Sequence, residues 1–313
     1  MIDQAFVLGA GLGTRLRPLT EELPKPLVPI FQKPLITFAF DHLGAVGVKS
    51  VVVNTHHLPE EFERVFPGKS YEQLSITLVH EPVLLDTGGG IKNVEPLLSG
   101  KPFLVYSGDV LTDLPLRPLI EEHFRAGNDV TLALRDTGLA SQVAFRDGRV
   151  RDIGNRYGQA GNFDYANVSV WNPEAFAQFS LGEKISFIPV LAKWIGKGGR
   201  IGGVVLNEGE WFNLGSPAQY LEVHRHIKEQ NWRPSYLRPN DWPASRAVSA
   251  LLAPRARVEG FSVIGADCHV GDRARVEDSI LWPEVQIAPD AHLKRCIVRA
   301  GRTVHGEHCD AVL

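Results

Sequence analysis

The chain has 313 residues, of which 44% are hydrophobic and 22% charged, and its formal net charge is −3. This length exceeds one average domain, so we expect one large core and a smaller second unit. The charge is close to neutral and no block of Lys or Arg stands out, which excludes a basic field for binding a nucleic-acid duplex. An anionic ligand must therefore be held by a local site.

Targeting and redox signals are weak. The first residues lack a basic region followed by a long apolar run, so no signal peptide is predicted. No stretch approaches the roughly 18 uninterrupted apolar residues of a membrane span. The three cysteines, Cys268, Cys296 and Cys309, suit neither a disulfide framework nor a zinc site. We expect a cytoplasmic protein that binds neither membrane nor nucleic acid.

Short apolar runs alternate with helical patterns over the first two thirds of the chain. Apolar residues recur at helical spacing in 35–43 and in 116–124. The alternation predicts an α/β layer built from βαβ units. The compact runs that read as buried parallel strands are 5–8, 50–54, 76–80, 103–107 and 130–134.

The pattern changes after residue 134. Residues 143–152 read as an antiparallel hairpin that turns at Gly148, and residues 165–171 read as a strand. Residues 217–229 read as a helix with Pro217 in its first turn. The next 20 residues, rich in proline and aromatic residues and without periodicity, predict a linker that packs against another part of the chain.

A six-residue period dominates the C-terminal region. Six-residue repeats with an aliphatic residue at one position predict a parallel β-helix, here of about three coils. We therefore predict a main domain at 1–229, a linker at 230–249 and a β-helix domain at 250–313. The repeating aliphatic residues are Val258, Ile264, Val270 and Val276, and then Leu281, Ile287 and Leu293.

The first predicted strand runs into a glycine-rich loop. Glycines after a buried strand allow a phosphate chain to approach backbone N–H donors. The loop lacks the Lys-Ser or Lys-Thr of a Walker A motif and the third glycine of a dinucleotide fingerprint, and Asn54 stands where a ribose-binding acid would be expected. The candidate nucleotide-binding residues are Leu8, Gly9, Ala10, Gly11, Gly13 and Thr14.

Two cations follow the loop. Arg15 comes directly after it, and Lys25 lies between two prolines ten residues later. Fixed cations beside a phosphate-binding loop suit the charge that develops on a leaving pyrophosphate. At this point residues 9–16, Gly-Ala-Gly-Leu-Gly-Thr-Arg-Leu, and residues 24–27, Pro-Lys-Pro-Leu, resemble the glycine-rich GTRL element and the PKP element of the sugar-1-phosphate nucleotidyltransferase family. The resemblance implies that Arg15 and Lys25 are the catalytic residues.

The resemblance extends to about residue 229. Residues 86–91 look like the family loop that lies along the base, which implies nucleotide-binding roles for Thr87, Gly88 and Gly89. Residues 106–109 look like the strand end whose aspartate, here Asp109, holds Mg²⁺. Carboxylate oxygens are what Mg²⁺ prefers, and open α/β sheets bind ligands at strand ends. Residues 211–217 resemble the later W-x-D-x-G-T-P element, which puts Asn213 at a metal-ligand position. Asn167 falls where relatives contact the sugar.

The family likeness implies a fold and a reaction. The expected fold is a Rossmann-like nucleotidyltransferase domain with a mixed, mainly parallel sheet, followed by a short left-handed β-helix. The expected reaction joins an NTP and a sugar 1-phosphate into an NDP-sugar and pyrophosphate, with Mg²⁺ as cofactor. Mannose-1-phosphate guanylyltransferases are among the relatives that carry such a β-helix, so GTP is the first expectation for the nucleotide. Homo-oligomerisation through the β-helix is a further expectation.

Two departures leave alternatives open. Asn213 stands where the family usually has an aspartate, and no E-K-P lysine occurs near 151–167, where Arg156 is a substitute cation. A similar absence of this lysine, together with a Thr-Gly-Gly-Gly-Ile loop like that at 87–91, occurs in N-acetylmuramate-1-phosphate uridylyltransferases, which the core also resembles. A non-catalytic regulatory homologue that binds an NDP-sugar, and a cytidylyltransferase acting on choline phosphate, remain as further alternatives. Glu81 reads either as an acceptor for a guanine edge or as a solvated residue at a strand end.

Overall fold

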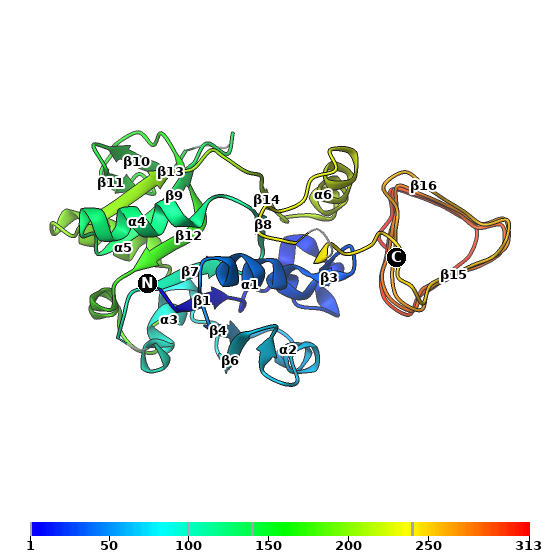
Figure 1. Cartoon of the computed structure of the whole chain (residues 1–313), viewed down its shortest axis with the longest axis horizontal. Helices are drawn as coiled ribbons and strands as arrows, with labels where there is room; N and C mark the ends of the chain where they lie inside the picture. Colours follow the sequence, from blue (N-terminus) through cyan, green and yellow to red (C-terminus); the bar gives the residue numbers. More distant parts are fainter. Residues whose placement is uncertain (1, 99, 139–140, 239–240) are drawn as a thin grey trace. The chain divides into compact units, whose positions relative to one another are not determined.

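The computed structural model describes residues 2–98, 100–138, 141–238 and 241–313 (Figure 1). The chain forms two compact units, each built from two separate segments. The first contains Met1–Leu12 and Ile36–Trp211, and the second contains Gly13–Leu35 and Phe212–Leu313. The predicted domain boundaries at residues 229 and 249 remain predictions, and so does the expected homo-oligomer.

The first unit is built on a ten-stranded sheet with the order β10-β11-β13-β9-β12-β7-β1-β4-β6-β5. Its core contains large buried side chains such as Phe6, Phe103 and Trp171. The strands are β1 (Gln4–Leu8), β4 (Ser50–Thr55), β5 (Ser70–Tyr71), β6 (Leu74–His80), β7 (Phe103–Ser107), β9 (Val130–Arg135), β10 (Val143–Arg146), β11 (Arg149–Ile153), β12 (Asp164–Trp171) and β13 (Ile201–Val205).

The sheet is mixed and mainly parallel, as predicted. Strands β6, β4, β1 and β7 pair in parallel, and β9 pairs in parallel with β13. Strand β12 lies antiparallel between β7 and β9, and β10 forms the predicted antiparallel hairpin with β11. The carboxyl ends of the parallel strands therefore meet at one edge of the sheet.

Helices pack on this sheet, α4 against β9 and β13 and α5 against β11 (Figure 1). The helices predicted at 35–43 and 116–124 are confirmed as α1 and α4. None of the helices in the described ranges is both long and apolar enough to cross a bilayer. The helices and the remaining short strand are α1 (Leu35–Ala45), α2 (Pro59–Val65), α3 (Asp86–Asn93), β8 (Val110–Thr112), α4 (Leu116–Ala126) and α5 (Phe187–Gly196).

The second unit joins an N-terminal segment to the C-terminal third of the chain. We call Gly13–Leu35 the signature segment. It contains three 3₁₀ helices, at Thr14–Leu16, Leu19–Glu21 and Lys25–Leu27, and a hairpin of β2 (Pro29–Ile30) and β3 (Lys33–Pro34). Strand β14 (Trp211–Asn213) precedes α6 (Pro217–Glu229), which has the predicted bounds. Ser216 caps this helix, because its side chain accepts a hydrogen bond from the Gln219 backbone N–H at 3.3 Å.

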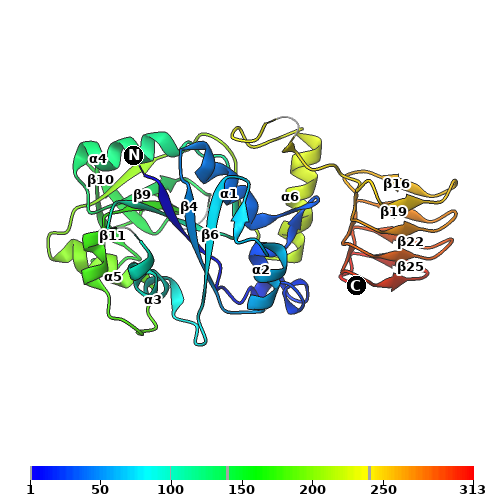
Figure 2. The same cartoon turned by 60° about the horizontal axis from the view of Figure 1, so that its bottom comes forward.

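The C-terminal region is a parallel β-helix. Its coils enclose a triangular cross-section in Figure 1, and Figure 2 shows β16, β19, β22 and β25 stacked as rungs. Two faces have four strands each, where about three coils were expected. The predicted aliphatic residues Ile264, Val270, Val276, Leu281, Ile287 and Leu293 are buried inside. The strands are β15 (Leu251–Leu252), β16 (Arg257–Glu259), β17 (Val263–Ile264), β18 (His269–Val270), β19 (Arg275–Glu277), β20 (Ile280–Leu281), β21 (Gln286–Ile287), β22 (His292–Lys294), β23 (Ile297–Val298), β24 (Thr303–Val304) and β25 (Glu307–Cys309).

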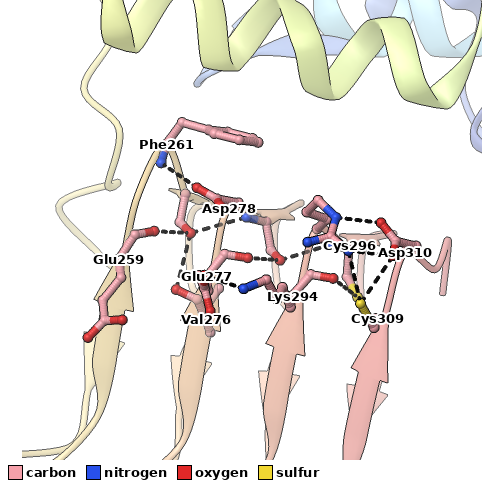
Figure 3. Close-up of polar contacts among 12 residues, drawn as sticks. Glu259, Phe261, Val276, Glu277, Asp278, Lys294, Cys296, Cys309 and Asp310 are labelled. Atoms are coloured by element: carbon pink, nitrogen blue, oxygen red, sulfur yellow. Dashed lines mark hydrogen bonds and ion pairs between the residues drawn. The ribbon is translucent and has the colours of Figure 1, made fainter.

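Polar side chains satisfy the backbone at one corner of the β-helix (Figure 3). The Ser262 hydroxyl donates to the Val276 carbonyl at 3.1 Å, and the Ser279 hydroxyl donates to the Glu277 carbonyl at 2.7 Å. Lys294 pairs with the Glu277 carboxylate at 2.7 Å. Buried backbone groups need such partners, so the corner contributes to the fold. Cys268, Cys296 and Cys309 are all free thiols.

Two buried histidines should make the protein sensitive to acid. Burial lowers the pKa of His42 to about 3 and that of His224 to about 4, from 6.5. Below pH 6.5 these histidines are protonated in the unfolded chain but remain neutral in the folded protein. The free energy of unfolding therefore decreases as the pH falls towards 4. Each histidine should lower the free energy of unfolding by about 2 kcal/mol at pH 5 relative to pH 7. Urea unfolding at both pH values checks this, and the loss should shrink in His224→Gln. An unchanged free energy of unfolding between pH 7 and pH 5 would contradict it.

Candidate active site

The carboxyl edge of the parallel strands carries several of the predicted residues. Strand β1 ends at Leu8, before the glycine loop, and β4 ends one residue after Asn54. Strand β6 ends just before Glu81, and β7 ends two residues before Asp109. The register places Leu8 beside both Asn54 and Ser107. Ligands of open α/β sheets bind outside this edge, at its carboxyl ends.

A buried polar bridge fixes the start of the glycine loop. The Gly9 backbone N–H donates to Asn54 Oδ1 at 2.8 Å, and Asn54 Nδ2 donates to Glu81 Oε1 at 2.8 Å. The Leu85 backbone N–H donates to Glu81 Oε2 at 3.0 Å. The expectation of a solvated Glu81 is wrong, because Glu81 is 1% exposed. Both of its oxygens accept from protein donors, so its role is to hold the loop and not to read a base.

This bridge should be sensitive to one amide substitution. Glu81→Gln replaces an acceptor oxygen by an NH₂ group, which then faces either Asn54 Nδ2 or the Leu85 N–H, both donors. A buried donor without an acceptor costs about 1–3 kcal/mol, so the free energy of unfolding should fall by that amount. Urea denaturation measures the loss, with Glu63→Gln on the exposed face of α2 as the control. Equal stability of the two variants would show that the bridge is unimportant.

The structure differs from the expectation at Asp86–Ile91. These residues form the first turns of helix α3, so their assignment as a loop is wrong. The Gly88 and Gly89 N–H groups donate to the Ile185 carbonyl at 2.8 and 3.0 Å. A Cβ at Gly88 would lie 2.9 Å from the same oxygen, so close packing requires glycine here. Contact of Thr87, Gly88 and Gly89 with a nucleotide remains a prediction.

Asp109 lies in the turn between β7 and β8, where it is half-buried. The turn lies against the end of β1, because the Gly108 N–H donates to the Leu8 carbonyl at 2.9 Å. Among the residues that the structure describes, no group of three or more His, Cys, Asp and Glu side chains could hold a metal ion. One acidic residue is enough for Mg²⁺, which usually takes one or two carboxylates together with phosphate and water oxygens.

The signature segment in the second unit brings its two motifs together. Gly13 has a φ of 60°, and a Cβ there would lie 2.9 Å from Thr20 Cγ2 and 3.1 Å from Lys25 Cβ. The Thr20 hydroxyl donates to the Gly13 carbonyl at 2.9 Å. Glycine is therefore required at this position for two reasons, the left-handed backbone and the close approach of Thr20 and Lys25. The end of the glycine loop thus packs directly against the chain that carries Lys25.

The two predicted catalytic cations differ in their surroundings. Arg15 is exposed, and the described part of the chain offers its guanidinium no hydrogen-bond or ion-pair partner. Lys25 is 7% exposed, and its Nζ donates to Asn213 Oδ1 at 3.4 Å. The amide oxygen of Asn213 thus already faces a cation, while its role as a metal ligand remains a prediction. A buried ammonium and an available guanidinium in one unit suit the binding of a polyanion.

A cavity of about 250 Å³ in the first unit contains the predicted sugar-binding residue. Asn167 has a φ of 64° and lies where the register of β12 against β9 shifts, between Tyr165 and Ser169. Such a bulge re-aims a side chain. The amide of Asn167 has no hydrogen-bond partner among the described residues, so it is available to a ligand. The other polar and aromatic lining residues are Thr137, Gln142, Asp164, Tyr165, Phe187 and Trp211.

Sequence reasoning missed much of this cavity. Thr137 and Gln142 belong to no motif, and only their folding around β12 brings them to the cavity. Trp211 could have been found, because it begins the W-x-D-like element, and its indole N–H donates to the Ala166 carbonyl at 3.0 Å. The substitute cation Arg156 is exposed and does not line the cavity.

Comparison with protein families gives two matches. Residues 4–230 match the nucleotidyl transferase family, and residues 243–308 match the GlmU-like C-terminal hexapeptide family. The second match agrees with the parallel β-helix and its six-residue period. The first match spans most of the chain and includes the glycine loop, Lys25, Asp109 and Asn213.

Three similar proteins are named as guanylyltransferases or uridylyltransferases. D-glycero-alpha-D-manno-heptose 1-phosphate guanylyltransferase from Aneurinibacillus thermoaerophilus is 35% identical over 59% of this chain and 81% of its own length. Mannose-1-phosphate guanylyltransferase from Mycobacterium tuberculosis is 27% identical over 93% of this chain and 83% of its own. N-acetylmuramate alpha-1-phosphate uridylyltransferase from Neisseria meningitidis is 31% identical over 70% of this chain and 96% of its own.

A solved structure supports the fold. HddC from Yersinia pseudotuberculosis, solved in complex with GMP-PN, superposes with a TM-score of 0.59 at 20% identity and covers 71% of this chain and 97% of its own. The family match, the relatives and the glycine loop at the carboxyl edge of the sheet lead to one conclusion. The chain belongs to the nucleotidyl transferase family and carries a GlmU-like hexapeptide β-helix at its C-terminal end.

Proposed function

We propose that the protein transfers a nucleotidyl group from an NTP to a sugar 1-phosphate and releases pyrophosphate, with GTP and a mannose-type 1-phosphate as the first pair to test. The glycine loop carries the proposal, because the Asn54–Glu81 bridge holds its Gly9 at the carboxyl edge of the sheet. Backbone N–H groups at such an edge suit a phosphate chain. Two of the relatives described above are named as guanylyltransferases.

The reaction needs positioning and charge neutralisation more than proton transfer. A sugar-phosphate oxygen is already ionised, so it attacks the α-phosphorus in line without a general base, and the bond to the pyrophosphate oxygen breaks. Gly11, Gly13 and Thr14 bind phosphate oxygens in this proposal. Arg15 and Lys25 neutralise the triphosphate and the departing pyrophosphate.

Magnesium is the proposed cofactor. Asp109 holds it through its carboxylate, and Asn213 is a second candidate through its amide oxygen. The half-buried carboxylate of Asp109, next to the start of the glycine loop, fits an ion that takes its other ligands from phosphates and water. When bound, the ion supplies positive charge to the phosphate oxygens.

The sugar is proposed to bind in the cavity of the first unit, with Asn167 donating to or accepting from a sugar hydroxyl. Asn167→Ala removes an amide that has no other partner among the described residues, and because φ is 64° here, alanine should also cost about 1 kcal/mol of stability. Losing one uncharged hydrogen bond of about 1 kcal/mol should raise the KM for the sugar phosphate several-fold. Steady-state kinetics with each substrate varied in turn measures this, and the KM for the NTP serves as the internal control. An unchanged KM for the sugar phosphate would place the sugar elsewhere.

Two further candidates have a specific observation in their favour. A uridylyltransferase for an N-acetylated sugar phosphate is favoured by the Neisseria relative, which matches over 96% of its own length. A non-catalytic homologue that binds an NDP-sugar is favoured by Asn213, because its amide faces Lys25 where the family usually has a carboxylate.

One assay separates these candidates. Pyrophosphate release is measured with Mg²⁺, each of the four NTPs and a panel of sugar 1-phosphates. Release with one matched pair supports the enzyme and identifies its substrates. Release with CTP and choline phosphate alone would contradict the proposal that the acceptor is a sugar 1-phosphate. No release from a folded protein that binds an NDP-sugar in calorimetry would favour the regulatory homologue and overturn the proposed reaction.

A further inference from the structure

The signature segment has little regular structure of its own. Its 3₁₀ helices span three residues each, and its hairpin strands span two each. Short 3₁₀ turns have poor hydrogen-bond geometry. The position of Arg15 and Lys25 must therefore depend on what the segment packs against, and within the second unit that is α6 and the β-helix.

A buried hydroxyl links the β-helix to the signature segment. The indole N–H of Trp282, which follows β20, donates to Tyr220 Oη of α6 at 3.1 Å. Tyr220 Oη in turn donates to the Pro29 carbonyl at 2.5 Å. Tyr220 is fully buried and Trp282 is 3% exposed. Burial raises the pKa of Tyr220 above its ordinary value, so its hydroxyl stays a proton donor at neutral pH.

The hairpin of the signature segment makes two more contacts of this kind. Gln32 Nε2 donates to the Ile264 carbonyl of β17 at 2.9 Å. The Phe31 N–H donates to His224 Nε2 at 3.1 Å, while the Tyr220 carbonyl lies 2.8 Å from Nδ1 of the same ring. This pattern requires a neutral imidazole that donates from Nδ1, as its lowered pKa allows.

Ion pairs hold the middle of the segment. The Glu22 carboxylate pairs with the Arg299 guanidinium at 3.1 Å and also contacts Arg302 directly. Arg299 is only 17% exposed at its side chain, and its Nε donates to the Leu313 carbonyl at 3.3 Å. Glu22 lies between the two predicted catalytic cations, three residues before Lys25.

We propose that the β-helix is a positioning element for the proposed reaction: Trp282, Arg299 and Arg302 fix the signature segment so that Arg15 and Lys25 meet the phosphates correctly. The inference rests on the proposed function. It assigns the β-helix a part in turnover in addition to its part in the fold. Misplacing a reacting group by about 1 Å can cost about a hundredfold in rate.

The test uses the full chain and the Glu22–Arg302 pair. Arg302→Ala, Glu22→Gln and the double variant form a cycle, and Arg302→Lys is the conservative variant. Arg295→Ala is the matched control, because the ion pair of Arg295 with Asp310 is also exposed and lies wholly within the β-helix. Exposed pairs contribute about 0–1 kcal/mol to stability, so these variants should all fold.

We expect kcat to fall about tenfold in Arg302→Ala, with little change in the KM for the sugar phosphate. Glu22→Gln should lower kcat by a similar factor, and the double variant should lower it no further than either single variant. Arg302→Lys should keep most of the wild-type kcat. Hydrogen exchange should become faster at the Leu16 and Val28 amides, which bond to Gly13 and Lys25 carbonyls. Arg295→Ala should change neither readout.

A buried variant gives a second route to the same answer. Tyr220→Phe removes the hydroxyl between Trp282 and Pro29, and it should lower kcat and speed exchange in the signature segment. If kcat and exchange in Arg302→Ala and Tyr220→Phe match those of Arg295→Ala, the positioning role is wrong. If the wild-type protein releases no pyrophosphate, the proposed function fails, while the exchange data still decide whether the β-helix holds the segment.

Discussion

Replacing Lys25 with alanine should lower kcat by about two to three orders of magnitude while the protein stays folded. Lys25 is 7% exposed, and Gly13 packs closely against its side chain. A cation fixed in this way stabilises charge as it develops on departing pyrophosphate, and water cannot replace it fully in a confined site. Pyrophosphate release under saturating substrate measures the effect.

Two comparisons make the Lys25 result decisive. Lys197→Ala removes an exposed lysine that follows α5 and should leave turnover unchanged. Arg15→Ala removes the exposed guanidinium and should also reduce kcat strongly. Circular dichroism establishes that each variant is folded. Near-normal turnover in both Lys25→Ala and Arg15→Ala would overturn the assignment of the catalytic cations.

Replacing Asp109 with alanine should lower turnover by about a thousandfold at millimolar Mg²⁺. Asp109 is half-buried beside the end of β1, and among the described residues no cluster of three or more acids, histidines or thiols could take over the ion. Raising the Mg²⁺ concentration should recover part of the activity, because phosphates still bind the ion. A Mg²⁺ titration of kcat measures both effects.

The control for Asp109 is a carboxylate in the same unit and away from the carboxyl edge. Asp3 precedes β1 and pairs with Lys101 at 3.6 Å, so Asp3→Ala should keep the wild-type Mg²⁺ dependence. If the Asp109→Ala protein keeps the wild-type Mg²⁺ dependence, the proposed role of Asp109 as a metal ligand is wrong. The Asn213→Asp variant extends the test, because a second carboxylate should lower the Mg²⁺ concentration needed for half-maximal turnover.

Much of the fold could be predicted because its signals are local. Strand β7 and helix α6 have the predicted bounds, since a compact apolar run and a Pro217 start are visible in the sequence itself. The β-helix was predictable because its aliphatic residues repeat every six positions. The number of rungs was not, because it depends on how the terminal coils pair.

The errors arise where distant contacts override local preference. Three consecutive glycines argue against a helix, yet Gly88–Gly90 lie in α3, where the Ile185 carbonyl, about a hundred residues away in the chain, accepts the N–H groups of Gly88 and Gly89. The burial of Glu81 depends on Asn54, a partner that no sequence motif links to it. The cavity around Asn167 likewise depends on a bulge with positive φ that the sequence does not reveal.

The pairing of Glu22 with Arg299 and Arg302 has a consequence for biosynthesis. These partners are 277 and 280 residues apart in the chain. The signature segment is made first, but its ion pairs can form only after 277 and 280 further residues have been added. The segment that carries Arg15 and Lys25 is therefore made long before its ion pairs can form. A growing chain can build the sheet of the first unit well before these cations reach their final place.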